Sequence, residues 1–400
     1  MKILYHHRTQ ANDGQAVHIR ALQRAFRETG HTVQEVGLVD QGAGDAAPAA
    51  DTGRSRWGWV TKLPRFALEL AEYSYSLMAR RRLVAAARSF EPDFLYERYA
   101  FGNFGGVAAA RQLELPLVLE VNSPLVDELE ATRGLTLKKL ARRIEGGIFR
   151  GATKICVVTQ VLGDMLCELG AEPGKILVTP NGVHPAAFDY AALGGRDVLR
   201  ARARRAFGLP EERPANEVVL GFVGYFRDWH RLDLVLEMLA QPGFEHLRFA
   251  IIGEGPAERE LRALSGALGV EQRVHFAGPQ PHDRIPELLP GFDIALMPAI
   301  NPYASALKLH EYMAAGLAII APDQPNLKEV VTDGESALLV PSGELDALMG
   351  ATRRLLEAPE LTARLGAAAA AAIETQGLTW QANAERVVEA VRASTTGGAS

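Results

Sequence analysis

The sequence predicts an α/β chain made of two doubly wound domains, each a parallel sheet with helices on both faces. Short apolar runs alternate with segments of helical period along nearly the whole chain. This alternation is typical of βα units that build a parallel sheet. The chain has 400 residues, and it holds too many such units for one small sheet. We therefore expect one sheet in each half.

The predicted strands are the short apolar runs, whose length suits strands that are buried on both faces. In the first half they span residues 2–6, 33–39, 93–97, 117–121, 154–159 and 175–179. In the second half they span residues 218–223, 248–252, 273–276, 293–297, 318–321 and 337–340. Helices are expected between them; the first places Ile19, Leu22 and Phe26 on one face and ends at Gly30.

The domain boundary is expected between residues 185 and 217. Residues 186–216 contain few apolar side chains, an Arg/Ala-rich run and two nearby prolines, Pro210 and Pro214. Such a stretch is typical of a linker. This divides the chain into an N-terminal domain of residues 1–185, a linker region of 186–216 and a C-terminal domain of 217–377.

Composition and charge exclude several classes of protein. The net charge is −5, which argues against wholesale nucleic-acid binding. No run is long and apolar enough to span a bilayer, and the N-terminus lacks a secretory signal pattern, so a cytoplasmic location is expected. Cys156 and Cys167 are expected to be buried thiols, with no disulfide and no metal site.

Basic residues are concentrated in the first half of the chain. Four of them surround Trp57 and Trp59, and three consecutive arginines begin at Arg80. Two interpretations stay open: solvated helix faces, or a surface that touches anionic lipid at the inner membrane face or an acidic acceptor. The residues concerned are Arg54, Arg56, Lys62, Arg65, Arg80, Arg81, Arg82, Lys138, Lys139, Arg142 and Arg143.

A phosphate site is predicted where the first strand of the second half ends. Gly224 follows that strand and precedes a helix; a glycine there lets a ligand approach the backbone, and the helix presents free N–H groups. Arg227, His230 and Arg231 add cationic or hydrogen-bonding side chains. A diphosphate is the ligand that this pattern favours.

The most informative stretch runs from Asn301 to Gly316. It predicts a loop that leads into a helix, where the N–H groups of Ala306 and Leu307 and the nearby Ser305 face a phosphate that Lys308 neutralises. Glu311 follows Lys308 on the same helix face. A carboxylate there accepts two hydrogen bonds from a ribose diol; the alternative is an ion pair with Lys308.

The run from Leu307 through Pro341 resembles the donor-site signature of family-4 glycosyltransferases with the GT-B fold. Pro180 to Val183 resembles that family's turn before the crossing between domains, and Trp380 resembles the aromatic residue of its C-terminal helix. The segment from Gly224 to His230, with the pattern Gly-x-Phe-Arg-x-Trp-His, resembles one branch of the family. The resemblance covers nearly the whole chain.

This resemblance implies two Rossmann-like domains facing across a cleft, with the final helix, residues 378–394, packed back on the N-terminal domain. It implies a nucleotide-diphosphate sugar held mainly by the C-terminal domain, and transfer with retention of anomeric configuration. It also implies that no metal and no other cofactor is needed, since cations such as Arg227 and Lys308 neutralise the leaving diphosphate.

Several positions depart from the family pattern. The family's acidic residue eight positions before the ribose-binding Glu is Tyr303 here, and its His after a middle N-domain strand is Asn122. Its Arg and Lys after the first C-domain strand fall on Tyr225 and His230. His184 replaces the Asp that ends the family's crossing turn. Tyr303 is nevertheless expected to contact the sugar, and Asn122 to bind sugar in place of the His.

The first half supplies the predicted acceptor side and part of the donor site. Gly14 and Gln15 match the family's glycine-rich loop near the donor phosphates. His18 is either catalytic or a core or capping histidine. Glu97 and Arg98, at the end of a strand, either contact the acceptor or form a local ion pair. Glu120 is expected to reach the acceptor from the next strand.

The predicted function is therefore a retaining sugar transfer from a nucleotide-diphosphate sugar to a hydroxyl group of a glycan, a lipid-linked saccharide or a natural product. Arg227, Lys308, Asn122 and His18 are the predicted catalytic residues. Two alternatives remain: a non-catalytic homologue that binds a nucleotide sugar or a glycan, and a nucleotide-sugar epimerase. A nicotinamide-dependent dehydrogenase is disfavoured, because no G-x-G-x-x-G follows the first strand.

Overall fold

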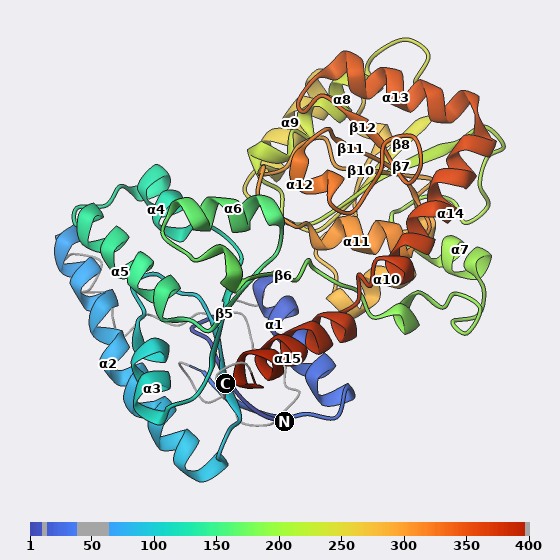
Figure 1. Ribbon diagram of the computed structural model, residues 1–400. Helices are drawn as coiled ribbons and strands as arrows, with labels where there is room; N and C mark the ends of the chain where they lie inside the picture. The colour runs from blue at the N-terminus through green and yellow to red at the C-terminus, as the bar shows by residue number, and fades with distance from the viewer. Residues whose placement is uncertain (10–13, 38–63, 397–400) are drawn as a thin grey trace. The chain divides into compact units, whose positions relative to one another are not determined.

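The computed structural model describes residues 1–9, 14–37 and 64–396, and the chain divides into two compact units (Figure 1). Unit 1 comprises Met1–Pro180 and Asn383–Ser400, and unit 2 comprises Asn181–Ala382. Of the predicted basic and aromatic surface, Arg54, Arg56, Trp57, Trp59 and Lys62 lie outside the described residues.

Unit 1 is a parallel sheet in the order β2-β1-β3-β4-β5-β6. Figure 1 shows α2, α3 and α5 on one side of it and α1 and α15 on the other. Its strands are β1 Lys2–His6, β2 Thr32–Val36, β3 Phe94–Arg98, β4 Leu117–Val121, β5 Lys154–Val157 and β6 Ile176–Val178. Its helices are α1 Gly14–Glu28, α2 Arg65–Phe90, α3 Gly105–Leu113, α4 Leu125–Arg133, α5 Lys138–Gly151, α6 Gln160–Glu168 and, from Asn383 onward, α15 Trp380–Thr396.

Unit 2 is a second parallel sheet, in the order β12-β11-β10-β7-β8-β9. Its strands are β7 Val218–Val223, β8 Leu247–Ile252, β9 Val274–Phe276, β10 Ile294–Leu296, β11 Ala318–Pro322 and β12 Leu338–Val340. Its helices are α7 Arg196–Ala206, α8 Asp233–Leu239, α9 Glu258–Ala267, α10 Ile285–Leu288, α11 Leu307–Ala314, α12 Pro325–Lys328, α13 Leu345–Glu357 and α14 Pro359–Thr375. The predicted fold class, two Rossmann-like domains, is confirmed.

The strand orders locate the ligand-binding edge of each unit. In unit 2 the order reverses between β7 and β10, and in unit 1 between β1 and β3. In open parallel sheets, ligands bind outside the carboxyl ends of the strands at this switch point. The residues that follow β7 and β10, and those that end β1 and β3, are therefore the first to inspect.

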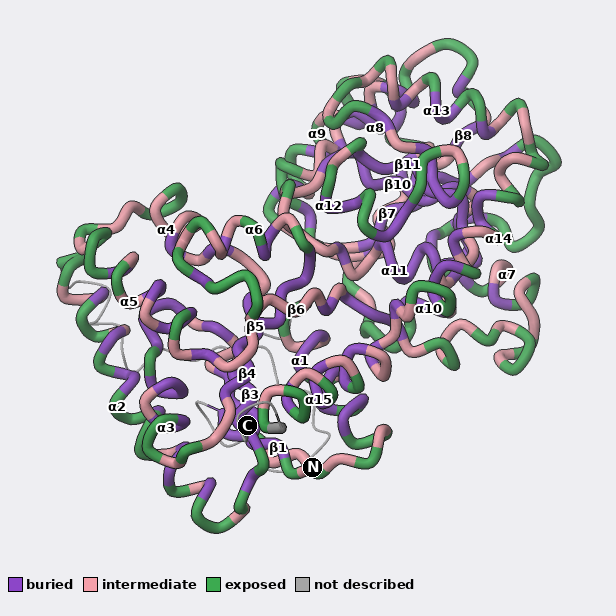
Figure 2. Tube along the Cα trace, in the orientation of Figure 1, coloured by how far each residue is buried: buried purple, intermediate pink, exposed green. Residues whose placement is uncertain are grey.

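Both faces of the second sheet are covered, which explains its apolar strands (Figure 2). Along β7, Val219 and Val223 pack into one hydrophobic cluster with α7, α10 and α11. Leu220 and Phe222 pack into another with α8, α9 and α13. Strands buried on both sides read as continuous apolar runs, and for this reason they are easy to find in the sequence.

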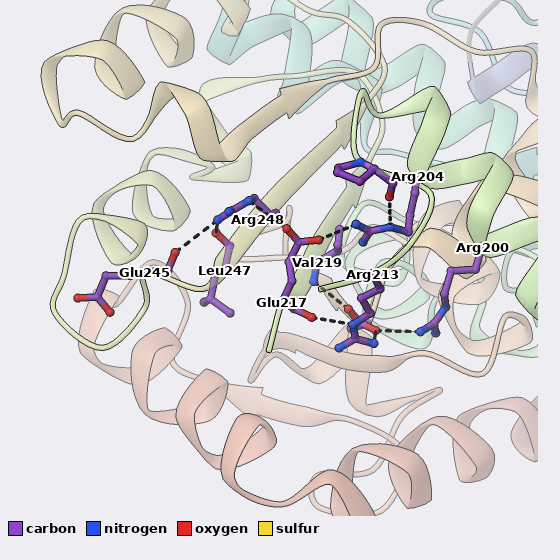
Figure 3. Close-up of polar contacts among 10 residues, drawn as sticks. Arg200, Arg204, Arg213, Glu217, Val219, Glu245, Leu247 and Arg248 are labelled. Atoms are coloured by element: carbon purple, nitrogen blue, oxygen red, sulfur yellow. Dashed lines mark hydrogen bonds and ion pairs between the residues drawn. The ribbon is translucent and has the colours of Figure 1, made fainter. Parts of the chain in front are cut away.

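The predicted linker 186–216 is wrong, because this segment belongs to unit 2. Its helix α7 buries Ala203 in the core, and Phe207, directly after the helix, stacks its ring on Phe292 at 5.5 Å. Arg204 is 1% exposed and its guanidinium bonds the Glu217 carboxylate at 2.7 Å (Figure 3). The Arg/Ala-rich composition suggested a linker, but it belongs to a helix that a buried ion pair holds to the sheet.

The chain crosses from one unit to the other at residues 180–181 and 382–383. Within each unit, a short contact joins the two segments next to the crossings. In unit 2, Val183 pairs with Thr379 in a parallel bridge. In unit 1, the Asn383 amide donates to the Pro180 carbonyl at 2.6 Å. The boundary thus lies a few residues before the predicted one. Within the described residues, no helix is both long and apolar enough to cross a membrane.

Candidate functional site

Gly224 and Lys308 meet at the switch point of unit 2. Gly224 follows β7 with φ +144°, and a Cβ built on it would lie 3.0 Å from the Lys308 Nζ. Lys308 comes from the first turn of α11, after β10. Glycine is required here because the backbone conformation is strained for other residues and the ammonium group fills the adjoining space.

The Lys308 ammonium has an apolar setting. Its Nζ lies 3.9 Å from the centroid of the Phe222 ring and 3.2 Å from His230 Nε2. Burial lowers the pKa of Lys308 to about 7, although the Glu311 charge acts in the opposite direction. Lys308 therefore exchanges a proton near neutral pH, and an anion placed beside it favours the charged form.

His230 lies at the end of a single 3-10 turn, Asp228–His230, that follows β7. Its Nδ1 accepts the backbone N–H of Arg227 at 3.2 Å. Burial and the neighbouring Lys308 lower the pKa of His230 to about 2. The His230 ring is therefore neutral near pH 7, which makes it one of the hydrogen-bonding rather than one of the cationic side chains of this loop.

Two arginines of the same loop differ in their use. Arg227 is exposed and its guanidinium stacks 4.8 Å above the Tyr225 ring. Arg231 instead pairs with Asp233 at 3.0 Å. Arg227 therefore remains the better candidate for a phosphate contact, as the sequence predicts.

The start of α11 is held by amide side chains that the sequence analysis missed. The Ser305 hydroxyl oxygen accepts the Asn181 backbone N–H at 3.1 Å, and the Ser305 carbonyl accepts the Asn181 amide at 2.6 Å. Asn326 donates to the carbonyl of Ala304 at 2.7 Å. Ser305 thus fixes the loop, while the first N–H groups of the helix, from Ala306 and Leu307, lack intrahelical acceptors.

Glu311 pairs with a histidine rather than with Lys308. The carboxylate is 6% exposed and its Oε1 lies 2.7 Å from His282 Nε2. The alternative of a Lys308–Glu311 ion pair is therefore wrong. His282 lies in the turn His282–Arg284 after β9. Only its closeness to Glu311 in the folded chain identifies it as part of the site. Tyr303 lies, partly exposed, in the loop before α11.

The loops after β7, β8 and β9 touch through their backbones. A Cβ on Gly253 would lie 2.0 Å from the Gly224 carbonyl oxygen, which is impossible without movement. The Gly253 N–H donates to the Gly278 carbonyl at 2.9 Å. Gly253 therefore sets how closely the three loops approach.

In unit 1, Glu120 is the centre of a polar cluster. Its Oε1 accepts hydrogen bonds from Arg98 and Asn122 and lies 3.4 Å from His18 Nδ1. Its Oε2 accepts the Tyr5 hydroxyl at 3.1 Å. Glu120 is 2% exposed, and the predicted contact of Glu120 with an acceptor stays a prediction. The Glu120 carboxylate orients its neighbours.

The charges in this cluster are fixed by its packing. Burial alone would raise the pKa of Glu120, but His18, Arg98 and hydrogen bonds from Asn122 and Tyr96 lower it to about 2. Burial, aided by Arg98 and opposed by Glu120, lowers the pKa of His18 to about 4. At neutral pH, His18 is therefore a neutral ring beside an ionised carboxylate.

Glu97 does not join this cluster. Successive side chains of a strand point to opposite faces, so Glu97 and Arg98 diverge at the end of β3. The Glu97 Oε1 lies 2.6 Å from His6 Nδ1 and 2.9 Å from the Asn103 amide, and Glu97 is 1% exposed. The alternative of a local ion pair between Glu97 and Arg98 is therefore wrong, and the predicted acceptor contact of Glu97 stays a prediction.

Gly14 and Gln15 begin α1 and are exposed. They lie on the same helix as His18, one turn before it. The structure thus brings His18, Arg98, Glu120 and Asn122 together in unit 1, and Gly224, His230, Lys308 and Glu311 together in unit 2.

Two family models match the chain, and together they cover most of it. Residues 12–187 match "Glycosyltransferase Family 4", and residues 208–372 match "Glycosyl transferases group 1". The first match falls largely in unit 1 and the second lies in unit 2.

The curated relatives found by sequence are also named as glycosyltransferases or glucosyltransferases. The chain is 30% identical over 287 residues to a D-inositol 3-phosphate glycosyltransferase of Acidothermus cellulolyticus, covering 68% of this chain and 61% of the relative. It is 28% identical to a 2-deoxystreptamine glucosyltransferase of Streptomyces kanamyceticus, covering 64% of this chain and 65% of the relative. The matched part thus spans less than two thirds of these two relatives.

Solved structures agree on the fold. Anabaena HepE in complex with UDP matches with a TM-score of 0.72 and 18% identity, over 98% of this chain and all of HepE. Sucrose-phosphate synthase from Thermosynechococcus elongatus matches with a TM-score of 0.74 and 19% identity, over 99% of this chain and 100% of that one. At such identities the likeness concerns the fold.

Proposed function

We propose that this chain, which belongs to the GT-B glycosyltransferases with a family 4 N-terminal domain and a group 1 C-terminal domain, moves a sugar from a nucleotide-diphosphate sugar to a hydroxyl acceptor. The observation that carries the proposal is the cluster at the switch point of unit 2. Cationic or donor groups, namely Lys308, His230 and Arg227, lie near one another there, and the charge of Glu311 acts on Lys308 from the same helix. This combination suits a diphosphate joined to a ribose.

In the proposed mode of binding, Lys308, Arg227 and the N–H groups at the start of α11 hold the diphosphate. Glu311 accepts hydrogen bonds from the ribose diol, and His282 behind it keeps the carboxylate in place. The solved relative HepE is described in complex with UDP and with UDP-glucose, which supports a nucleotide sugar as the donor class.

The proposed reaction is a same-face substitution that retains the anomeric configuration. The bond between the anomeric carbon and the phosphate oxygen breaks while the acceptor oxygen bonds to that carbon. The acceptor proton passes to the departing phosphate oxygen. The cations stabilise the charge that grows on the diphosphate, so we propose that no metal is required.

For unit 1 we propose contacts with the acceptor through His18 and Asn122. Glu120 fixes both side chains, and the neutral His18 ring can exchange hydrogen bonds with sugar hydroxyls. The acceptor class stays broad: a glycan, a lipid-linked saccharide or a natural product. The similarity to an inositol phosphate glycosyltransferase and an aminocyclitol glucosyltransferase favours a polyhydroxylated ring.

We expect one nucleoside diphosphate among UDP, GDP, ADP and dTDP to raise the thermal unfolding midpoint in the presence of EDTA. At a ligand concentration 100 times the dissociation constant, the stabilisation is about 2.7 kcal/mol. Glu311→Ala should lose the response, because the ribose loses its carboxylate partner. Glu260→Ala, at an exposed acid on α9, is the matched control and should respond like the wild type.

No shift with any of the four ligands, in a protein that unfolds cooperatively, would contradict a nucleotide-sugar site. A shift without release of the diphosphate when donor sugar and acceptors are added would favour the non-catalytic homologue instead. An epimerase would convert the donor sugar without any acceptor, so analysis of the recovered donor by NMR separates that alternative.

We also propose that the outward face of α2 touches an anionic membrane. This face exposes Phe66, Leu70, Leu77 and Met78 by 46–59%, and the run Arg80–Arg82 follows on the same helix. Apolar side chains beside arginines are typical of helices that lie on anionic bilayers. The basic residues of α5 fit less well, because Lys138 pairs with Glu130 and Arg142 pairs with Asp127 and Glu145.

We expect the protein to sediment with vesicles that contain about one third anionic lipid and not with purely zwitterionic vesicles. Leu70→Ser combined with Leu77→Ser should reduce binding to the anionic vesicles. Leu140→Ser, at an exposed residue of α5, serves as the control. Equal binding to both vesicle types would contradict a membrane role for this face. Light scattering that shows the protein self-associating through this face, which would cover its apolar side chains, would contradict that role as well.

A further inference from the structure

Too many hydrogen-bond donors surround the His230 ring. The Arg227 backbone N–H lies 3.2 Å from Nδ1. On the other side, Trp229 Nε1 lies 3.3 Å and Lys308 Nζ lies 3.2 Å from Nε2. Three nitrogen donors therefore face a single imidazole.

A neutral imidazole offers one acceptor nitrogen and one N–H. If Nδ1 accepts the Arg227 N–H, then Nε2 carries the proton, and this N–H points at two further donors. In the opposite tautomer Nδ1 carries the proton, and this N–H points at the Arg227 N–H instead. A doubly protonated ring has no acceptor nitrogen at all. The described residues also place no carboxylate within 4.0 Å of the Lys308 ammonium. A neutral Lys308 amine accepts the Nε2 proton, but the Trp229 indole N–H then still faces a protonated nitrogen. Whenever Nε2 carries the proton, the ring and Lys308 therefore offer Trp229 no acceptor.

The geometry points to a phosphate-binding nest formed by Trp229, His230 and Lys308, in which the Trp229 indole N–H donates to a phosphate oxygen of the bound nucleoside diphosphate. This inference rests on the proposed function and adds Trp229 to its binding residues. A phosphate oxygen supplies the acceptor that the Trp229 N–H lacks and favours the charged form of Lys308, and charge-assisted hydrogen bonds of this kind are the strong ones.

The exposure of Trp229 fits this role. The side chain is 49% exposed although it is large and apolar, so no core packing explains its place in the loop. The indole ring stands edge-on to His230, with 5.6 Å between the ring centroids and an interplanar angle of 88°. The N–H edge, rather than the ring face, is therefore turned toward the nest.

The test compares Trp229→Phe with the wild type by calorimetric titration, using the nucleoside diphosphate that the thermal assay selects and the corresponding nucleoside. Phenylalanine keeps an aromatic ring but removes the N–H. We expect the diphosphate affinity to fall about tenfold or more, as for a hydrogen bond to a charged group, while the nucleoside affinity stays unchanged. Glu260→Ala, which removes an exposed polar group on α9 away from the nest, should bind like the wild type.

A second pair of variants tests which nitrogen of the His230 ring faces the phosphate. Glutamine at position 230 places an amide N–H near the position of Nε2, whereas asparagine places one near Nδ1. We therefore expect His230→Gln to retain more diphosphate affinity than His230→Asn.

Unchanged diphosphate binding in Trp229→Phe would overturn the nest, and an equal loss for nucleoside and diphosphate would show stacking on the base instead. In both cases the wild type still binds the diphosphate, so the proposed function survives. A wild type that binds no nucleoside diphosphate removes the proposed function and the nest together.

Discussion

Lys308→Ala should lower the rate of sugar transfer about 10²–10³-fold, the range seen when one group that stabilises developing negative charge is removed. The Lys308 ammonium lies against the Phe222 ring and Gly224, and the residue is partly buried. Its attraction for a diphosphate is therefore less screened than that of a surface charge. Steady-state kinetics with saturating acceptor measures the effect. The fold should persist, because the substitution removes a buried charge.

Lys328→Ala is the control for this variant. Lys328 ends α12, is half exposed and pairs with Asp323, so its loss should leave transfer within about twofold of the wild type if surface ion pairs contribute as little as usual. Full activity in Lys308→Ala would mean that Lys308 does not stabilise the leaving group.

The pH dependence of ligand binding offers a second check on the same residue. Without ligand, burial holds the pKa of Lys308 at about 7, and the bound diphosphate should raise it. Above pH 7 binding must then take up a proton, and the affinity should fall with rising pH, by up to about tenfold per pH unit. Lys308→Arg keeps its charge at these pH values and should lose this slope. A constant wild-type affinity from pH 7 to 9 would contradict the lowered pKa.

The fold could be predicted from the sequence because its signal is local. Strands buried on both faces appear as short apolar runs, and each predicted strand corresponds to one of the twelve observed in the described residues. The ends differ where capping intervenes: the strand predicted to reach residue 159 stops at Val157, since Thr159 caps α6 through its hydroxyl at 3.1 Å from the Leu162 N–H.

The site could be predicted only in part, because many of its contacts join distant residues. Gly224 and Lys308 carry local signals, since a glycine after a strand and a positive charge in a first helical turn suggest phosphate binding, and Glu311 follows Lys308 on the same helix face. The partners Asn181 and His282 carry none: they meet Ser305 and Glu311 across 124 and 29 positions of the chain. Likewise, Glu97 and Arg98 are neighbours in sequence, and only the pleat of β3 sends them to different clusters.

Charge was the least reliable guide, as the segment before β7 shows. Arginine-rich stretches suggest solvent exposure, yet Arg204 is among the most buried large side chains of unit 2. Its guanidinium bonds the Pro210 carbonyl at 2.6 Å as well as Glu217. Arg248 reaches the other oxygen of Glu217 at 3.2 Å (Figure 3). The buried carboxylate therefore anchors α7 to the start of β7 and β8.

Glu217→Ala should destabilise unit 2 by about 3–5 kcal/mol, because it leaves the guanidinium of Arg204 buried without its counter-charge. For a unit of this size the unfolding midpoint should fall by on the order of 10 °C. Differential scanning calorimetry measures it. Glu211→Ala is the matched control: Glu211 pairs with Arg205 at 2.6 Å, but both side chains are more than half exposed, so the cost should stay within about 1 kcal/mol.

The double variant Arg204→Met with Glu217→Leu separates the charge from the packing. Replacing both partners of a buried pair by apolar side chains of similar volume is often close to neutral. The double variant should therefore recover most of the stability that Glu217→Ala loses. If Glu217→Ala unfolds at the wild-type midpoint, water must reach Arg204, and segment 186–216 is held to unit 2 by its apolar contacts and by the other polar contacts of its arginines, such as Arg213 with Asp293. In that case Phe207→Ala, which opens the stack on Phe292, becomes the substitution that detaches it.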